Sequence, residues 1–328
     1  MKKLFLVTGG AGYIGSHMTN LLIEKGHKVI IVDNLSSGFK FLVNKKAKFF
    51  KIDLCNYDKL SSKLKKFKID CVFHFAANRD VDQSEKKPKE FYYNNVYGTE
   101  NLLKFCKFNK IKKFIFSSTC AVYGDQNKSK VSELDNTLPI SNYGLTKLIN
   151  ENSIMNYADN DVFKYFILRY FNVVGANPKK NIGQVGYGPL VQNLALNYVK
   201  KKYKFNLFGK DYPTKDGTCM RDFIDVNDLV ELHYLTYLKI KSHGNNILNL
   251  GYNKSYSVLE VVNTFSKVVN KKIVLKYLSR RSGDIVKIYS DNRRLKKIFP
   301  NWVKKYNLSD SIKNVVEWNI KLKKSNRV

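Results

Sequence analysis

Short apolar runs alternate with longer helical patterns over the first half of this chain. Residues 3–8 form an apolar run that ends in glycines, and apolar side chains then recur every three or four positions over residues 13–25. Further β-type runs and helical stretches follow, at 29–32, 48–52, 57–67, 71–75, 89–109, 113–117 and 163–170. Strands that alternate with helices form parallel sheets with helices on both faces. The pattern predicts a doubly wound parallel-sheet α/β fold.

A glycine-rich turn joins the first predicted strand to the first predicted helix. Gly9, Gly12 and Gly15 follow the pattern G-x-x-G-x-x-G. Glycines let the backbone of such a turn approach a pyrophosphate, and the following helix N-terminus offers it free N–H groups. Asp33 ends the next strand, where its carboxylate can accept both ribose hydroxyls and would repel a 2′-phosphate. The unit therefore predicts a Rossmann domain that binds NAD in preference to NADP.

A third predicted strand ends at Asp53. This carboxylate is placed to form a hydrogen bond with the adenine edge of the dinucleotide, although a simple turn residue would look the same in the sequence.

Beyond about residue 175 the composition of the chain changes, because Gly and Asn cluster over 175–188 and shorter mixed elements follow. We expect an NAD-binding domain over residues 1–174. Residues 175–328 would form a smaller, interleaved substrate-binding domain, part of which returns to the sheet.

Charge is the most unusual feature of the composition. The 58 Lys and Arg residues outnumber the 27 Asp and Glu residues, for a net charge of +31. A basic surface attracts nucleic acid, but these lysines are spread along the whole chain, with no basic tail or recognisable nucleic-acid motif. We expect solvated lysine faces that help to capture anionic substrates, and no nucleic-acid partner.

Targeting signals and cysteine patterns point to a reducing compartment. The first apolar run is far too short for a signal peptide, and no run of about 18 apolar residues predicts a membrane span. The five cysteines are scattered and form no CxxC pair, which argues against a disulfide framework and a metal site. We expect a cytoplasmic protein with no membrane partner and no bound metal.

A tyrosine and a lysine stand four positions apart in a predicted helix. Tyr143 and Lys147 would share one face of that helix. A phenol near pKa 10 is a poor base, but a neighbouring ammonium group stabilises the phenolate and lowers the pKa. The spacing alone also fits an amphipathic helix with a lysine at its rim. Thr119, at the end of the preceding strand, supplies a hydroxyl that would orient a substrate oxygen beside the tyrosine.

Together with the motifs given below, these residues make the chain resemble the extended short-chain dehydrogenase/reductases over about residues 3 to 320. The motifs that carry this resemblance lie at 9–17, 33–35, 74–77, 94–96, 117–119, 122–124, 143–147 and 168–172. A second group is similar to the UDP-glucose 4-epimerases in particular, at 208–209, 212–214, 216–218 and 221–224.

The resemblance implies a set of binding residues. Besides the three glycines of the turn, the implied NAD contacts are Tyr13, Ile14, Asp33, Asn34, Leu35, Ser36, Ser37, Gly38, Asp53, Leu54, Phe75, Ala76, Ala77, Asn78, Arg79, Asn94, Thr119, Tyr143, Lys147 and Phe171. The implied nucleotide-sugar contacts are Thr119, Tyr143, Asn172, Leu190, Phe208, Arg221, Arg281, Asp284 and Ile288. Arginines supply forked donors to a diphosphate, and a carboxylate can bind ribose hydroxyls.

The activity implied by the resemblance is the interconversion of UDP-glucose and UDP-galactose. Tyr143 would remove the proton of the C4 hydroxyl while NAD accepts the C4 hydride. The 4-keto sugar would turn in the site and receive the hydride on its other face, with Thr119 guiding the C4 oxygen. Lys147 would tune Tyr143 and hold the nicotinamide ribose.

Three positions depart from the family pattern. Arg79 stands where lysine is common, and Pro189 replaces an asparagine that touches the diphosphate. Ile288 occupies a position that is tyrosine in some glucose-restricted members and smaller in enzymes that accept N-acetylated sugars. A smaller side chain leaves room beside C2, so UDP-GlcNAc and UDP-GalNAc are further candidate substrates.

Two rival functions share this fold. Nucleotide-sugar dehydratases need an acid and a base near C5 and C6 and carry Asp-Glu after the threonine, whereas Cys120 and Ala121 follow Thr119 here. UDP-glucuronate decarboxylases are a related alternative, and a non-catalytic NAD-binding protein is another. The intact Thr119, Tyr143 and Lys147 set favours an enzyme, specifically a 4-epimerase.

The predicted helix 89–109 has apolar and aromatic side chains on more than one face. The family pairs such helices with those after the catalytic tyrosine in dimers. We expect a homodimer, with burial inside a single chain as the alternative.

Overall fold

The computed structural model describes residues 2–160, 162–281 and 284–326, which form two compact units. Unit 1 consists of Met1–Asp125, Asp135–Tyr170 and Val230–Leu248, and unit 2 consists of Gln126–Leu134, Phe171–Leu229 and Asn249–Val328. Each unit is thus built from separate stretches of chain, and one stretch from the second half belongs to unit 1. The division at residues 174 and 175 stays a prediction.

Unit 1 contains a seven-stranded sheet in the order β11-β7-β5-β4-β1-β2-β3. The strands are β1 (Leu4–Thr8), β2 (Lys28–Asp33), β3 (Lys48–Lys51), β4 (Cys71–His74), β5 (Lys113–Thr119), β7 (Lys164–Tyr170) and β11 (Asn246–Leu250). Neighbouring strands from β3 to β7 are parallel, and Val7 on β1 pairs with Ile31 on β2 and with Phe73 on β4. The strand order reverses between β1 and β4, which is where doubly wound sheets bind ligands.

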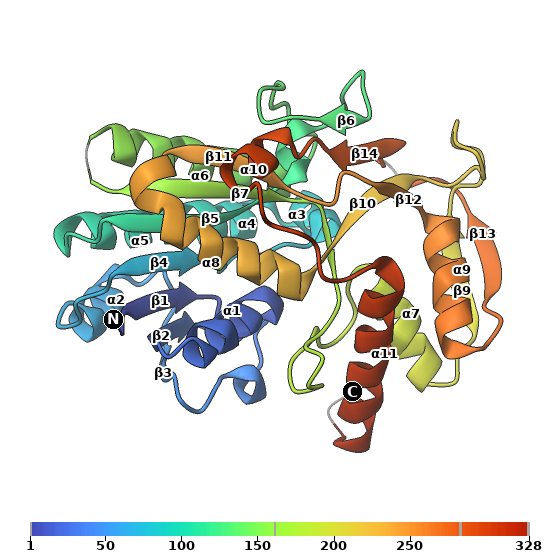
Figure 1. The fold of residues 1–328 in the computed structure, drawn as a ribbon, viewed down its shortest axis with the longest axis horizontal. Helices are drawn as coiled ribbons and strands as arrows, with labels where there is room; N and C mark the ends of the chain where they lie inside the picture. Colours follow the sequence, from blue (N-terminus) through green and yellow to red (C-terminus); the bar gives the residue numbers. More distant parts are fainter. Residues whose placement is uncertain (1, 161, 282–283, 327–328) are drawn as a thin grey trace. The chain divides into compact units, whose positions relative to one another are not determined.

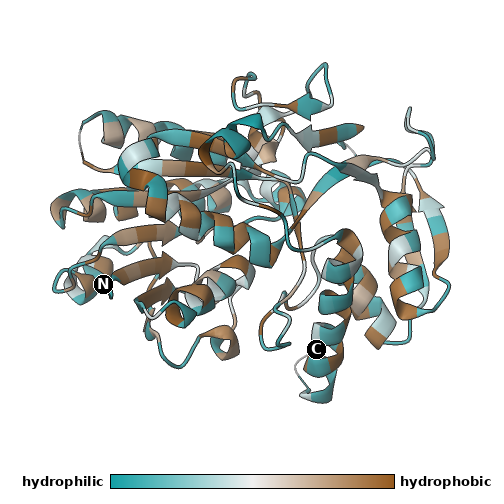
Figure 2. Ribbon diagram, in the orientation of Figure 1, coloured by the Kyte–Doolittle hydropathy of each residue, from teal (hydrophilic) through white to brown (hydrophobic). Residues whose placement is uncertain are grey.

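Helices cover both faces of this sheet (Figure 1). One face carries α1 (Tyr13–Glu24) and the part of α8 (Val226–His243) that lies in unit 1, where the Tyr237 ring lies 4.8 Å from that of Phe5. The other face carries α2 (Tyr57–Leu64), α5 (Gly98–Phe108) and α6 (Asn142–Asp159), whose apolar side chains share one core with the strands. Figure 2 shows hydrophobic strands β1 and β2 beside helices that carry both hydrophobic and hydrophilic residues. The predicted doubly wound parallel sheet is confirmed.

The segment predicted as one helix over 89–109 is divided in the structure. After α3 (Val81–Lys86), it consists of α4 (Pro88–Phe91), a π-helix η2 (Tyr92–Tyr97) and α5. The predicted helical stretch is therefore confirmed, with a π-helical section in its middle that the sequence did not predict. Single turns of π-helix occur frequently at functional sites, and this one carries Asn94, an implied NAD contact.

Unit 2 combines a small mixed sheet with three packed helices. Its strands are β6 (Lys130–Val131), β8 (Asn172–Val174), β10 (Met220–Asp225), β12 (Ser255–Ser257) and β14 (Lys287–Ser290), with β9 (Lys204–Phe208) and β13 (Val274–Leu278) as a separate parallel pair. Its larger helices are α7 (Leu190–Val199), α9 (Val258–Val269) and α11 (Leu308–Lys324), and they share a second apolar core. The remaining short helices of the chain are η1 (Lys40–Leu42), η3 (Cys120–Tyr123) and α10 (Arg293–Ile298). Within the described ranges, no helix is long and apolar enough to span a membrane.

Candidate active site

The glycine turn between β1 and α1 tolerates no larger side chain at two of its positions. Gly9 has φ +70, and a Cβ there would lie 2.6 Å from the backbone nitrogen of Ala76. A Cβ at Gly15 would lie 2.2 Å from the carbonyl oxygen of Gly9. The turn therefore packs its bare backbone against the segment that follows β4, at the point where the strand order reverses. This backbone is the predicted cradle for the NAD pyrophosphate.

Asp33 ties the end of β2 to this turn. Its Oδ2 accepts a hydrogen bond from the Ala11 N–H at 3.0 Å, and its Oδ1 accepts one from the Leu35 N–H at 2.8 Å. Burial raises the pKa of Asp33 despite these two bonds. Asp53 lies close by, since it accepts a hydrogen bond from the Asn34 amide at 3.0 Å. Unit 1 thus brings together Asp33 and Asp53, the two side chains that the sequence predicts to bind the adenosine part of NAD.

Replacing Asp33 by alanine is expected to remove bound NAD from the purified protein. The change deletes the predicted ribose acceptor and leaves two backbone N–H groups without their acceptor, at about 1–3 kcal/mol each where they are buried. The NAD released from the denatured protein, measured per chain, provides the test. Asp58→Ala, at the exposed start of α2, is the matched control. Wild-type NAD content in the Asp33 variant would contradict this assignment.

Helix α6 places Tyr143 and Lys147 against the end of β5. Ser141 caps the helix by accepting the Gly144 N–H at 3.1 Å, which fixes the start of the helix one residue before Tyr143. The Tyr143 hydroxyl forms a hydrogen bond with Thr119, and the Lys147 ammonium donates to the Ser117 carbonyl at 2.8 Å. The structure therefore brings the three predicted catalytic residues together.

The pKa values of the pair differ from expectation. Burial raises the pKa of Tyr143 to about 12, although the hydrogen bond with Thr119 and the charge of Arg79 act to lower it. Burial also lowers the pKa of Lys147 to about 7, against the opposing charge of Glu151. The prediction of a lowered tyrosine pKa is wrong, because desolvation outweighs the neighbouring charges. Between the two values the tyrosine keeps its proton and the lysine amine is neutral.

A buried polar network supports the loop that follows β4. The Asn95 side chain accepts the Asn78 N–H at 2.7 Å and donates to the Asn78 carbonyl at 2.9 Å, and the Asn94 amide donates to Asn95 at 2.8 Å. His74 bridges Thr8 and Thr99 at 2.7 and 2.9 Å. This network holds the segment of implied NAD contacts from Phe75 to Arg79. Asn95 and His74 lie within motifs that carry the family resemblance, but no pattern in the sequence gives them a role.

The implied nucleotide-sugar residues belong to unit 2, apart from Thr119 and Tyr143. Arg221 pairs with Asp284 at 3.3 Å, and Tyr212 donates to the same carboxylate at 3.4 Å. Arg281 stacks on Phe208 with 4.0 Å between guanidinium carbon and ring centroid. These residues form a connected group of arginines, aromatic rings and one carboxylate. The sequence gives Tyr212 no role, although it lies in one of the motifs of the resemblance and contacts the Asp284 carboxylate here.

The other implied residues of unit 2 lie on neighbouring elements. Ile288 is buried on β14 directly beside Arg221 on β10. Asn172 begins β8, and Leu190 begins α7 directly after Pro189, its N-cap residue. Phe171, an implied NAD contact, also belongs to unit 2. Every other implied NAD residue lies in unit 1.

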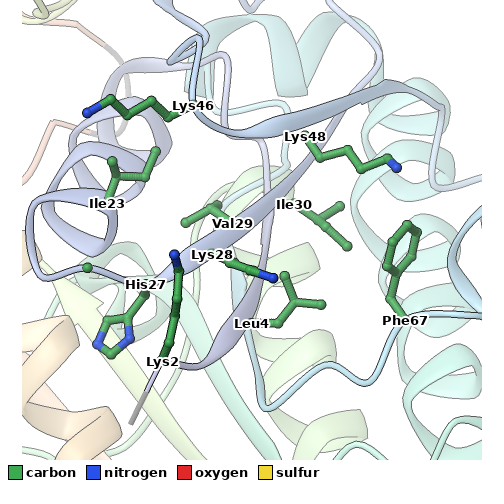
Figure 3. Close-up of a pocket in the computed structure, with 11 residues that line it drawn as sticks. Lys2, Leu4, Ile23, His27, Lys28, Val29, Ile30, Lys46, Lys48 and Phe67 are labelled. Carbon is green, nitrogen blue, oxygen red and sulfur yellow. The ribbon is translucent and has the colours of Figure 1, made fainter.

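A cavity of about 590 Å³ lies at the opposite edge of the unit 1 sheet, beside the amino ends of β1, β2 and β3 (Figure 3). Lys2, Lys28, Lys46 and Lys48 supply its charge, over apolar side chains such as Ile30. Helix α1 ends beside it, where the helix dipole favours positive charge. None of the predicted site residues lines this cavity.

Comparison with known proteins identifies the family of this chain. Residues 5–251 match the family model described as the NAD dependent epimerase/dehydratase family. The chain belongs to this family. It is 38% identical over 319 residues to a UDP-glucose 4-epimerase from Lactobacillus helveticus, covering 95% of this chain and 96% of that one. It is also 38% identical to the bifunctional protein GAL10 of Pachysolen tannophilus, of which it spans only about half, 48%.

Solved structures show the same relationship. A crystal structure of a UDP-glucose 4-epimerase matches with a TM-score of 0.94 and 36% identity, over 99% of both chains. The UDP-glucose-4-epimerase from Stenotrophomonas maltophila, with bound NAD and formylated UDP-arabinopyranose, matches with a TM-score of 0.93 and 31% identity, over 99% of this chain and 100% of that one. The UDP-Glc/GlcNAc 4-epimerase from Campylobacter jejuni matches with a TM-score of 0.84 and 35% identity, over 97% and 99%. The predicted family, the prediction of an epimerase and the prediction of NAD as cofactor are confirmed.

Proposed function

We propose that this protein is an NAD-dependent UDP-sugar 4-epimerase that interconverts UDP-glucose and UDP-galactose. The observation that carries the proposal is the contact of α6 with the end of β5, which joins Tyr143 to Thr119 and seats Lys147 one turn away. The glycine turn and Asp33 supply the NAD-binding features in the same unit. The full-length similarity to UDP-glucose 4-epimerases supports this choice within the family.

Each side chain has a definite task in this reaction. NAD, when bound, supplies a reversible hydride acceptor. Tyr143 takes the proton of the sugar C4 hydroxyl and later returns one to the C4 oxygen, while Thr119 orients that oxygen. Lys147 stabilises the phenolate form of Tyr143 through its positive charge. Arg221 and Arg281 bind the diphosphate, and Asp284 accepts hydrogen bonds from the uridine ribose.

Incubation of the purified protein with UDP-galactose tests the proposal. We expect UDP-glucose to form with no net oxidation, so that product appears without accumulation of NADH. A dehydratase would instead release a 4-keto-6-deoxy sugar nucleotide, but no carboxyl group follows Thr119 to support that chemistry, since Cys120 and Ala121 begin η3. An absence of turnover with every UDP-sugar would favour a non-catalytic NAD-binding protein.

The proposed activity extends to UDP-GlcNAc and UDP-GalNAc because of Ile288. An isoleucine occupies less space than a tyrosine beside the proposed C2 substituent. Ile288→Tyr is expected to lower kcat/KM for UDP-GlcNAc by at least about 10-fold, the effect of a poorly fitting group in a closed pocket, with a smaller effect on UDP-glucose. The ratio of the two kcat/KM values is the measurement, and Ile288→Leu is the control of similar volume. An unchanged ratio would remove Ile288 from the determinants of sugar choice.

We also propose a cytoplasmic homodimer. Tyr93 and Tyr97 on η2 stack with 5.4 Å between ring centroids and are exposed, as is Leu145 on the adjacent α6. Exposed aromatic side chains on neighbouring helices favour a second copy of the chain as the partner. Sedimentation is expected to show a dimer at micromolar concentration, and Tyr93→Glu together with Tyr97→Glu is expected to dissociate it. A wild-type monomer at that concentration would reject the dimer.

The cytoplasmic location is supported by the cysteines. They are scattered along the chain and all are free thiols, as expected in a reducing compartment.

A further inference from the structure

One face of α6 contacts three consecutive residues of β5, and its third contact has no role so far. Tyr143, Lys147 and Glu151 follow one another at intervals of four along α6, so they share one face. Tyr143 meets Thr119, Lys147 meets the Ser117 carbonyl, and Glu151 accepts a hydrogen bond from the Ser118 hydroxyl. The helix thereby holds the catalytic end of β5 at every residue.

Glu151 is a costly residue to bury at this place. Its side chain has no exposed surface, and its carboxylate is held by Arg169 on β7 through contacts of 2.6 Å to Nη2 and 3.1 Å to Nε. The Arg169 guanidinium lies 4.8 Å from the centre of the Tyr123 ring, in the short helix directly after Thr119. Burying two charged side chains costs more free energy than burying two apolar side chains of similar size, because the charges lose their hydration. A role beyond stability would account for keeping the charge.

We propose that Glu151 is a positioning residue of the catalytic pair, which holds Lys147 in its ammonium form and fixes the strand end that carries Thr119. This inference rests on the proposed function, because it assigns Lys147 the task of stabilising the Tyr143 phenolate. The charge of Glu151 acts on Lys147 to raise its pKa, against the lowering effect of burial. Loss of that charge would favour the tautomer with a neutral lysine and a protonated, inactive tyrosine.

Other charged and titratable groups also face the pair. Arg79 follows β4, His74 is on β4, Tyr170 is on β7 and Cys120 is in η3. Burial and the Lys147 charge lower the pKa of His74 to about 3, and burial raises the pKa of Tyr170 well above its usual value. These two groups therefore stay uncharged over the neutral range. We therefore expect Lys147 to be the group of the pair that titrates near pH 7.

The test is Glu151→Gln, which keeps the shape and removes the charge. Below the pKa of Lys147 both Tyr143 and Lys147 are protonated. Tyr143 then has no phenolate form that can act as the base, so kcat falls on the acid side. In the variant this acid limb is expected to move down by about one pH unit, and the plateau of kcat to fall by about 10-fold, with KM unchanged. Ser118→Ala is the matched control, because it removes one hydrogen bond from Glu151 and leaves the carboxylate charge. Its acid limb is expected to stay in place.

A second readout does not depend on epimerase activity. The Lys147 side chain, followed by 13Cε NMR during a pH titration of the protein, is expected to titrate near 7 and at lower pH in Glu151→Gln. If Glu151→Gln fails to fold, the double variant Glu151→Leu with Arg169→Met carries the same test. Identical Lys147 titration in wild type and variant overturns the inference. Absence of turnover in the wild type with a shifted lysine titration would instead reject the proposed function alone.

Discussion

Tyr143→Phe is expected to lower turnover of UDP-galactose by about 10²–10⁴-fold, the usual contribution of a positioned acid or base. Phenylalanine keeps the ring in place on α6 but removes the hydroxyl that bonds Thr119 and takes the C4 proton. Thr119 and Lys147 cannot replace it, because a threonine hydroxyl is a far weaker acid and Lys147 is turned to the Ser117 carbonyl. The measurement is the initial rate of UDP-glucose formation, with bound NAD determined on the same samples.

Tyr157→Phe is the matched control for this experiment. Tyr157 lies on the same helix, packed at the edge of the apolar core that α6 shares with the sheet. Its replacement is expected to leave both turnover and NAD content unchanged. Near-normal turnover in Tyr143→Phe would assign the proton transfer to another group. Loss of NAD along with turnover would mean that the variant damages the cofactor site rather than the chemistry.

Arg169→Met is expected to reduce the free energy of unfolding by about 3–5 kcal/mol, because it leaves a buried carboxylate without its partner. Glu151 is fully buried and Arg169 is only 4% exposed, so water cannot replace the lost contact. The partner charge also favours the charged form of the arginine itself. Burial acts to lower its pKa, and the hydrogen bonds and charge of Glu151 raise the pKa overall. Urea unfolding of wild type and variant gives the difference.

Two further variants separate the buried charge from the loss of a side chain. Glu151→Leu combined with Arg169→Met removes both charges and is expected to recover most of the stability, since apolar pairs of similar size replace buried ion pairs at little cost. Arg293→Met breaks an ion pair of 2.7 Å in which the arginine is 84% exposed, and little change is expected there. Equal destabilisation in the single and double variants would show that packing, rather than the unpaired charge, sets the effect.

Local patterns predicted the parallel sheet well. The strands predicted at 3–8, 29–32 and 113–117 correspond to β1, β2 and β5, with ends that differ by at most two residues. Strands buried on both faces read as continuous apolar runs, so their positions follow from neighbouring residues alone. The division of residues 89–109 was missed because a π-turn needs one extra residue per turn, and that depends on what the turn packs against.

The same contrast holds in the candidate site. The spacing of four along α6 predicted that Tyr143 and Lys147 share a face, and the same rule applied once more would have found Glu151. The predicted direction of the tyrosine pKa was wrong, since only a folded chain shows how far each group is removed from water. The contacts of Tyr212 and Asn95 join residues far apart in the sequence, and no local spacing reveals them.

The sequence by itself determined the order of strands and helices, the glycine turn with Asp33 after the next strand, and the helical face that carries Tyr143 and Lys147. These features depend on residues that are close in sequence. For such residues, the geometry of a helix or a strand alone fixes which side chains are neighbours. The tertiary structure alone decided how burial shifts the pKa values of the pair, and the contact of Glu151 with Ser118 and Arg169. The burial of a group and the charges around it depend on side chains from several strands and helices. Only folding brings those side chains together.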